Sequence, residues 1–141
     1  MQILEKIKKL NFPVGQYVVV GGAVLTAHGI RDTEDLDILV SPELFKKCKE
    51  EGWVATPWTK AGKKGKDWLT KNGIELYAEL IMVGDSILVE NLTKNDIEII
   101  EGVPFLSLTR LMEFKKEYLR LYNRPKDIKD IFLIETYLRQ K

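Results

Sequence analysis

Two aspartates at the start of an apolar segment constrain this chain most strongly. Asp35 and Asp37 flank Leu36, and the segment continues as Ile38-Leu39-Val40. Alternate residues of a strand lie on one face, so a strand here projects both carboxylates to the same side of a sheet. Two ionised carboxylates this close repel each other unless a proton or a metal ion lies between them. The pattern fits a metal-binding strand or an edge strand with a solvated polar face, and both interpretations stay open.

A glycine pair precedes these aspartates. Gly21 and Gly22 directly follow the apolar run Tyr17–Val20, which predicts a short buried strand. Glycine lets the backbone approach a bulky group closely and adopt conformations that other residues avoid. We therefore expect this turn to lie against a large anionic group such as a triphosphate.

The composition fits one folded domain. The chain has 141 residues, of which 45% are hydrophobic and 30% charged, so a core is possible and wholesale disorder is excluded. The formal net charge of +1 gives no argument for nucleic-acid binding. The single cysteine suits a reducing compartment, and no apolar run reaches the roughly 18 residues that span a bilayer. We expect a cytoplasmic protein with no membrane contact, made of one domain with an α/β core at 1–102 and helices at 103–141.

The order of helical and strand patterns predicts an α+β fold. Its expected form is a mixed sheet with flanking helices and a C-terminal helical pair. Helical spacing or helix-start signals predict helices at 2–10, 23–28, 41–51, 107–122 and from 125 onward. Apolar runs between turn signals predict strands at 17–20, 35–40, 53–58, 67–70, 74–83 and 87–89.

The long strand expected at 74–83 offers a third carboxylate. Glu75 and Glu79 share one face of such a strand. Two Mg²⁺ ions that serve an in-line displacement at phosphorus need several carboxylates, so either glutamate could join Asp35 and Asp37. The alternative is that both glutamates are exposed, because a half-buried strand alternates polar and apolar residues by default.

The residues around the aspartates resemble the nucleotidyltransferase superfamily, which has the DNA polymerase β-like fold. Its signature is a hydrophobic strand, Gly-Gly or Gly-Ser, about a dozen residues, Asp-x-Asp or Asp-x-Glu, and a third acid on a neighbouring strand. The string His28–Ile38 is similar to small bacterial and archaeal members, including minimal nucleotidyltransferases and the toxins of abortive-infection toxin–antitoxin pairs. Val103–Leu108, Lys115 and Arg124–Asp130 resemble the helical tail of these proteins, so the resemblance covers most of residues 17–138.

This resemblance implies a reaction and a metal site. The reaction is transfer of a nucleoside monophosphate from a nucleoside triphosphate to a hydroxyl acceptor, which could be a small molecule, an RNA or a protein, with release of pyrophosphate. Asp35, Asp37 and Glu79 would bind Mg²⁺ or Mn²⁺, and Glu75 is the second choice for the third acid. The family more often has an aspartate at that third position.

The same resemblance implies which residues would bind the nucleotide. Gly21 and Gly22 would hold the triphosphate through their backbone amides. Arg31 and Thr33, in the loop before the aspartates, would contact phosphate or position that loop. A hydrogen bond between the Thr33 hydroxyl and nearby backbone is the simpler alternative.

Three residues of the C-terminal helices complete the nucleotide site that the resemblance implies. Lys126 would contact phosphate or base, with Asp127 beside it, and Lys115 would reach into the cleft. The simpler alternatives are an ordinary charged helix start for Lys126 and Asp127, and a snorkelling lysine for Lys115.

Two further features carry weaker signals. His28 is the only histidine, and we expect its side chain to bond free carbonyls at a helix end, since one histidine cannot build a zinc site. The lysine-rich loop 60–66, between Trp58 and Trp68, fits either a solvated loop or a nucleic-acid contact.

Two other functions stay open at this point. The chain could be a nucleotide-binding module without transfer activity, or the toxin of a toxin–antitoxin pair that has an RNA or an antitoxin as its partner. A homodimer could complete the acceptor site, because 141 residues leave little room beyond the core.

Overall fold

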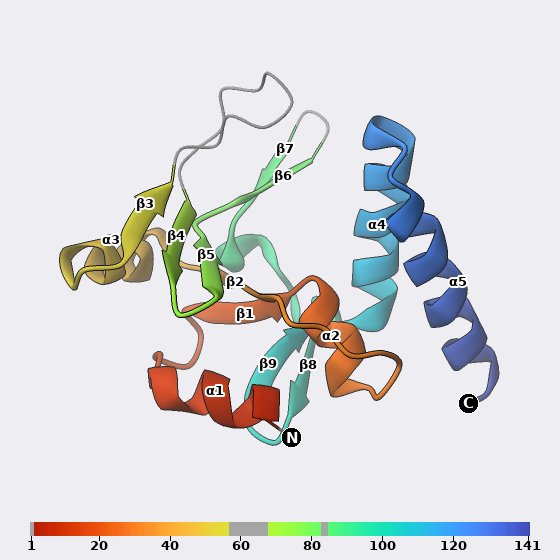
Figure 1. The fold of residues 1–141 in the computed structure, drawn as a ribbon, viewed down its shortest axis with the longest axis horizontal. Coiled ribbons are helices and arrows are strands. Elements are labelled where there is room, and N and C mark those ends of the chain that lie inside the picture. Colours follow the sequence, from red (N-terminus) through yellow and green to blue (C-terminus); the bar gives the residue numbers. More distant parts are fainter. Residues whose placement is uncertain (1, 57–67, 83–84) are drawn as a thin grey trace.

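A seven-stranded mixed β-sheet forms the centre of the protein in the computed structural model, which describes residues 2–56, 68–82 and 85–141 (Figure 1). The strands lie in the order β3-β4-β5-β2-β1-β9-β8. Strand β2 is antiparallel to β1 on one side and parallel to β5 on the other, which makes the sheet mixed. The strands are β1 (Tyr17–Val20), β2 (Leu36–Val40), β3 (Val54–Thr56), β4 (Trp68–Lys71), β5 (Ile74–Tyr77), β8 (Ile97–Ile100) and β9 (Val103–Leu106).

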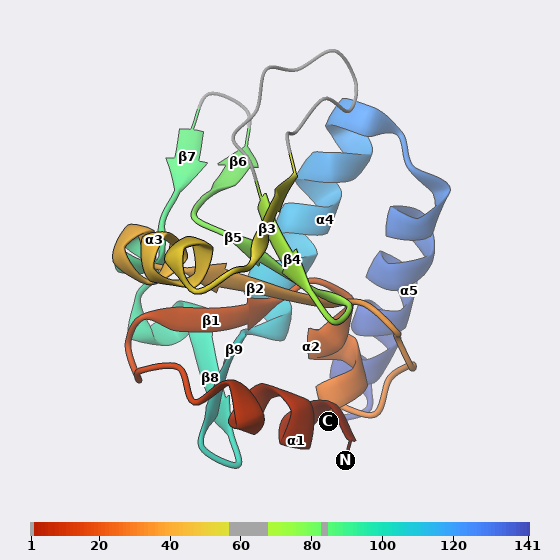
Figure 2. The ribbon, with the colours of Figure 1, turned by 60° about the vertical axis from the view of Figure 1, so that its left-hand side comes forward.

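Helices flank this sheet, and the last two form a pair at one side of it (Figures 1 and 2). They are α1 (Gln2–Leu10), α2 (Gly22–Ala27), α3 (Pro42–Glu50), α4 (Leu108–Tyr122) and α5 (Pro125–Arg139). The predicted α+β fold, with a mixed sheet, flanking helices and a C-terminal helical pair, is therefore confirmed. None of the described helices has both the length and the apolar character needed to cross a membrane.

The helix-start signals act as the sequence predicts. The Ser41 hydroxyl accepts a hydrogen bond of 3.1 Å from the Leu44 amide at the start of α3. The Ser107 hydroxyl accepts a bond of 3.2 Å from the Arg110 amide and starts α4 in the same way. Asn123, in the left-handed conformation with φ of 49°, ends α4.

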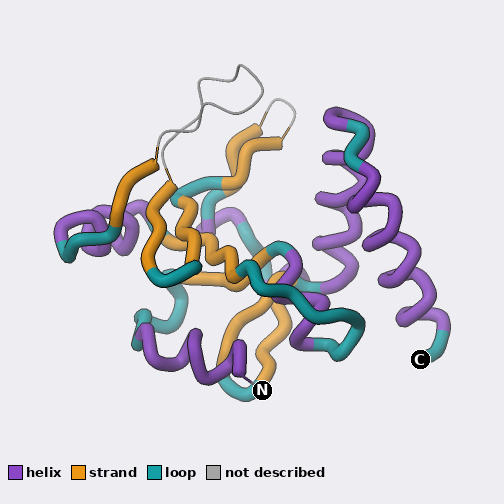
Figure 3. The backbone as a smooth tube through the Cα atoms, viewed as in Figure 1, coloured by secondary structure: helices purple, strands orange, loops and turns teal. Residues whose placement is uncertain are grey.

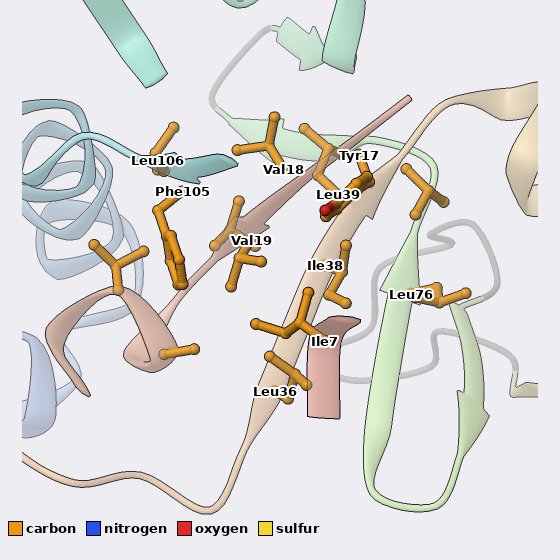
Figure 4. Close-up of a cluster of buried hydrophobic side chains, with 14 of the residues drawn as sticks. Ile7, Tyr17, Val18, Val19, Leu36, Ile38, Leu39, Leu76, Phe105 and Leu106 are labelled. Carbon is orange, nitrogen blue, oxygen red and sulfur yellow. The ribbon is translucent and has the colours of Figure 1, made fainter. Parts of the chain in front are cut away.

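Strand β2 is buried on both faces, and one polar residue interrupts it. Its residues Leu36, Ile38, Leu39 and Val40 are at most 2% exposed. Figure 4 shows three of them among the apolar side chains of β1, β5, β9 and α1. Asp37 is the half-buried exception. The position of this carboxylate is therefore fixed by the core on either side of it.

The prediction of one long strand at 74–83 is wrong. The chain bends at Ala78, so β5 stays in the large sheet while β6 (Leu80–Met82) pairs with β7 (Asp85–Ile87) in a separate two-stranded sheet (Figure 3). Glu79 lies between β5 and β6 and does not share a strand face with Glu75.

The C-terminal part of the sheet was not expected from the sequence. Residues 103–106, which the pattern assigned to the helical segment, form the fully buried strand β9 between β1 and β8. A continuous apolar run such as Val-Pro-Phe-Leu has no alternation to separate a buried strand from a helix. Two 3₁₀ turns, Val89–Asn91 and Lys94–Asp96, precede β8, and the first follows closely on β7. The lysine-rich loop 60–66 and Trp58 lie outside the described residues.

The expected side-chain cap by His28 is also wrong. His28 does end α2, but its ring faces β8 and α5. Its Nε2 lies 3.0 Å from Oε2 of Glu98, and its Nδ1 lies 3.5 Å from the hydroxyl of Tyr137. The ring therefore packs between elements, because α5 lies close to the end of α2.

Candidate active site

The glycine turn lies directly against an aspartate. Pairing of β1 with β2 sets Val20 beside Asp37, and Gly21 follows with a left-handed φ of 68°. A Cβ atom at Gly21 would lie 2.9 Å from Oδ2 of Asp37, and one at Gly22 would lie 3.1 Å from Oγ1 of Thr33. Both distances are tighter than ordinary contacts, so a Cβ atom at either position would displace the side chain that faces it.

Asp37 is the centre of a group of carboxylates. Parallel pairing of β2 with β5 sets Glu75 directly beside it, and the exposed Asp35 precedes β2. Burial raises the pKa of Asp37 to about 7, with a further contribution from the negative charges of Glu75 and Asp35. The positive charges of Lys126 and Lys115 act in the opposite direction. A positive charge at this place would thus stabilise the ionised form of Asp37.

The strand register favours Glu75 over Glu79 as the third acid. The Glu79 carboxylate lies beyond β5 and accepts a hydrogen bond from the Ser86 hydroxyl of β7. Glu75 instead lies beside Asp37, and its Oε2 accepts a hydrogen bond of 2.5 Å from the Tyr77 hydroxyl. Burial and that bond raise the pKa of Tyr77 above its ordinary value, so the hydroxyl keeps its proton and donates. The identity of the third acid stays a prediction.

The oxygen donors fit a hard divalent cation in kind. Carboxylate oxygens are the ligands that Mg²⁺ and Mn²⁺ prefer, and two of them already perturb Asp37. Within residues 2–56, 68–82 and 85–141, however, no three acidic, histidine or cysteine side chains converge closely enough to hold a metal ion as they lie. A site with three such ligands would therefore require at least one of these side chains to rotate.

A buried ionic cluster ties the loop before the aspartates to the C-terminal helices. Asp130 of α5 is only 2% exposed and accepts two hydrogen bonds from Arg31, of 2.8 and 2.9 Å. Nζ of Lys115, on α4, lies 2.9 Å from the same carboxylate and 3.7 Å from that of Asp127. Asp127 is fully buried and accepts two further bonds, of 2.7 and 3.0 Å, from Arg124.

This cluster bears on several of the residues expected to bind nucleotide. Arg31, Lys115 and Asp127 are all bound within the protein, which fits a positioning role for Arg31. The Thr33 hydroxyl accepts a bond of 3.2 Å from the Asp35 amide, as its simpler alternative requires. Lys126 is exposed and acts electrostatically on Asp37, so it remains available to a phosphate.

The sequence interpretation missed Asp130 as a residue of this region. Burial alone would raise the pKa of Asp130, but the hydrogen bonds from Arg31 and Lys115 outweigh burial and lower it. A signal for it exists in the chain. Arg124, Asp127 and Asp130 follow one another at intervals of three residues, which puts them on one face of a helix.

Two solved structures share this architecture over almost the whole chain. One is a crystal structure of ANT(2'')-Ia in complex with adenylyl-2''-tobramycin, with a TM-score of 0.56, 15% identity, and coverage of 96% of this chain and 85% of that one. The other is a solution structure of the antibiotic-resistance factor ANT(2'')-Ia, with a TM-score of 0.57, 16% identity, and coverage of 96% and 80%. The chain therefore shares the fold of these two ANT(2'')-Ia structures. No protein-family model and no curated protein matches the chain.

Replacing Gly21 should disturb Asp37. Gly29 provides a comparison, since its φ of 71° is also positive and a Cβ there would meet nothing within 4 Å. Both Gly→Ala variants lose stability through the positive φ. Gly21→Ala should lose about 1–3 kcal/mol more, because its φ of 68° and ψ of −151° belong to a region almost restricted to glycine and because the Asp37 side chain must move away from the new Cβ. Urea denaturation measures the difference, and equal losses would contradict the contact.

Asp130→Asn should destabilise the protein strongly. The substitution leaves the charges of Arg31 and Lys115 buried beside a neutral group, so we expect a loss of about 3 kcal/mol or more in the free energy of unfolding. Glu113→Gln serves as the control, because Glu113 pairs with Arg110 on the surface and such pairs contribute about 1 kcal/mol or less. Chemical denaturation compares the two, and similar losses would refute the importance of burial.

Asp37→Asn should stabilise the protein at high pH when divalent cations are absent. The folded pKa of about 7 lies above the ordinary value of 3.8, so the stability that a protonated Asp37 contributes is present below about pH 4 and is lost as the pH rises through 7. The asparagine side chain does not ionise, so the variant keeps this stability. At pH 8 its free energy of unfolding should exceed that of the wild type by on the order of 2–4 kcal/mol.

Unfolding curves at pH 5, 6.5 and 8 in EDTA measure this advantage. Glu34→Gln, an exposed acid in the same loop, should show no such trend. A gain for Asp37→Asn that does not change with pH would show that Asp37 has an ordinary pKa.

Proposed function

We propose that this protein transfers a nucleoside monophosphate from a nucleoside triphosphate to a hydroxyl acceptor and releases pyrophosphate. The observation that carries the proposal is the contact between the glycine turn and Asp37, with Glu75 on the next strand beside it. A turn that exposes backbone amides next to clustered carboxylates can accommodate a triphosphate together with a divalent cation.

The metal ligands in this proposal are Asp35, Asp37 and Glu75, with Glu79 as the alternative third acid. Mg²⁺ or Mn²⁺, when bound, would neutralise these carboxylates and draw electron density from the phosphate being transferred. The acids that hold the cation would therefore also set the place of the reacting phosphorus.

The chain's own groups would act on both substrates. Backbone amides of Gly21 and Gly22 would donate to the outer phosphates, and the exposed Lys126 would add a positive charge nearby. The acceptor oxygen would bond to the α-phosphorus as the bond from that phosphorus to the bridging oxygen breaks, and pyrophosphate leaves. The proton of the acceptor hydroxyl would pass to a carboxylate oxygen of the cluster that does not bind the cation.

The similar solved structures suggest which substrates to test first. One of them holds adenylyl-2''-tobramycin, which is an adenylyl group joined to a hydroxyl of an aminoglycoside. ATP and aminoglycosides are therefore the first donor and acceptors that we propose to test. RNA ends and protein hydroxyls follow, and label in either would favour the toxin alternative.

Incubation with Mg²⁺, each α-labelled nucleoside triphosphate, tobramycin and a cell extract should place label in one acceptor fraction. Asp35→Ala and Asp37→Asn should each lower that labelling by about 10²-fold or more, the scale seen when one electrostatic group of a site is removed. The fold should persist in both variants. Glu34→Gln is the matched control and should label at the wild-type rate, since this acid is exposed and lies outside the cluster.

Two outcomes would contradict this proposal. Nucleotide binding with no label in any fraction would favour a binding module without transfer activity. Labelling by Asp37→Asn at the wild-type rate would show that the carboxylate cluster takes no part in the transfer.

A further inference from the structure

We propose that Tyr77 is a positioning residue that holds the Glu75 carboxylate in place for cation binding and transfer. This inference rests on the proposed function and adds a residue that the sequence pattern does not indicate. Tyr77 would act only through Glu75, without touching substrate itself.

The geometry of β5 places the two side chains together. Glu75 and Tyr77 are alternate residues of the strand, so they lie on the same face, opposite the buried Ile74 and Leu76. The Tyr77 hydroxyl donates to Oε2 of Glu75 across 2.5 Å. Hydrogen bonds to a carboxylate are roughly twice as strong as bonds between neutral groups.

The ring of Tyr77 is itself held by its surroundings. It is half-buried, and its centroid lies 6.4 Å from that of Trp68, on the neighbouring strand β4, with the two planes tilted by 33°. Aromatic pairs at this separation attract each other beyond simple burial. Packing of the ring therefore fixes the position of the hydroxyl. A donor on a long flexible side chain would not be fixed in this way.

Glu75 needs such a restraint more than a shorter acid would. A glutamate has one more rotatable bond than an aspartate, and fixing a glutamate side chain costs about 1.5–2 kcal/mol of entropy. Asp37 lies beside it as well, and the negative charges of the two carboxylates repel each other. The bond from Tyr77 opposes both effects.

The bond also makes the two carboxylate oxygens of Glu75 different from each other. Oε2 is occupied by the Tyr77 hydroxyl, whereas Oε1 has no hydrogen-bond partner in the part of the chain that the structure describes. Oε1 is thus the oxygen left for a cation or for the proton of an acceptor hydroxyl. Groups that orient a metal ligand in this way commonly change metal affinity by 10- to 100-fold when removed.

Tyr77→Phe tests this role, because it deletes one hydroxyl and keeps the ring that packs on Trp68. Mn²⁺ binding is measured by electron paramagnetic resonance in the presence of the non-hydrolysable analogue α,β-methylene ATP. We expect Tyr77→Phe to weaken Mn²⁺ binding about 10-fold. Tyr17→Phe is the matched control. Tyr17 is a buried tyrosine at the other end of β1, opposite Val40, and its loss should leave binding unchanged.

A second background separates positioning from general damage to the fold. Glu75→Ala should itself weaken Mn²⁺ binding, and adding Tyr77→Phe to it should have no further effect, because the hydroxyl then has no carboxylate to hold. An additional loss in that double variant would overturn the inference.

The remaining outcomes distinguish this inference from the proposed function. Wild-type Mn²⁺ affinity in Tyr77→Phe, with weakened binding in Asp37→Asn, would overturn the role of Tyr77 alone. A wild-type protein that binds no Mn²⁺ with the analogue would overturn the metal-dependent transfer and this inference together.

Discussion

The pairing of β2 with a strand on either side is the constraint on which the candidate site depends. One neighbour, β1, delivers the glycine turn to Asp37, and the other, β5, delivers Glu75. Side chains alternate along a strand, so a slip of one residue in either pairing would turn these groups to the opposite face. The apolar residues of β2 are buried on both faces and prevent such a slip. The core therefore sets the relative positions of groups that would otherwise repel one another.

A second constraint fixes the loop that leads into the aspartates. Charges buried as deeply as those of Asp127 and Asp130 are costly unless each is paired, and here Arg124, Arg31 and Lys115 supply the pairs. A buried ionic cluster adds little to stability compared with apolar packing, but it accepts only one arrangement of its members. The pair α4 and α5 is thus held to the loop in a defined position, and the backbone that carries Thr33 and Asp35 is held with it.

Much of the fold follows from local signals in the sequence, while the parts that differ depend on tertiary contacts. Ser41 and Ser107 start helices because a hydroxyl acceptor is needed at that position whatever surrounds it. The bend at Ala78 has no such marker, because the alternation that puts Glu75, Tyr77 and Glu79 on one face continues across it. Strand β9 was missed because a strand buried on both faces shows no alternation.

The candidate site was also predictable only in part, because local spacing in the sequence determines some of its contacts and tertiary packing determines the others. The closeness of Gly21 to Asp37 is implied by the spacing of the motif, since both residues lie near the ends of adjacent strands. Whether Glu75 or Glu79 faces Asp37 depends on the register of β5 against β2, which the pattern of residues does not mark. The partners of Arg31 and Lys115 depend on how the last two helices dock, and that is decided far from either residue.

The bond between Arg31 and Asp130 joins positions 99 residues apart, and this separation bears on how the molecule is made. A chain emerging during synthesis would complete β1, the glycine turn and β2 long before α5 exists. Contacts between residues so distant in sequence form late, because a long loop must close before they contribute. The loop beside the carboxylates would then acquire its final order only as the last helix docks. Assembly of the site would thus be among the last events of folding, and an incomplete chain would carry the motif without its geometry.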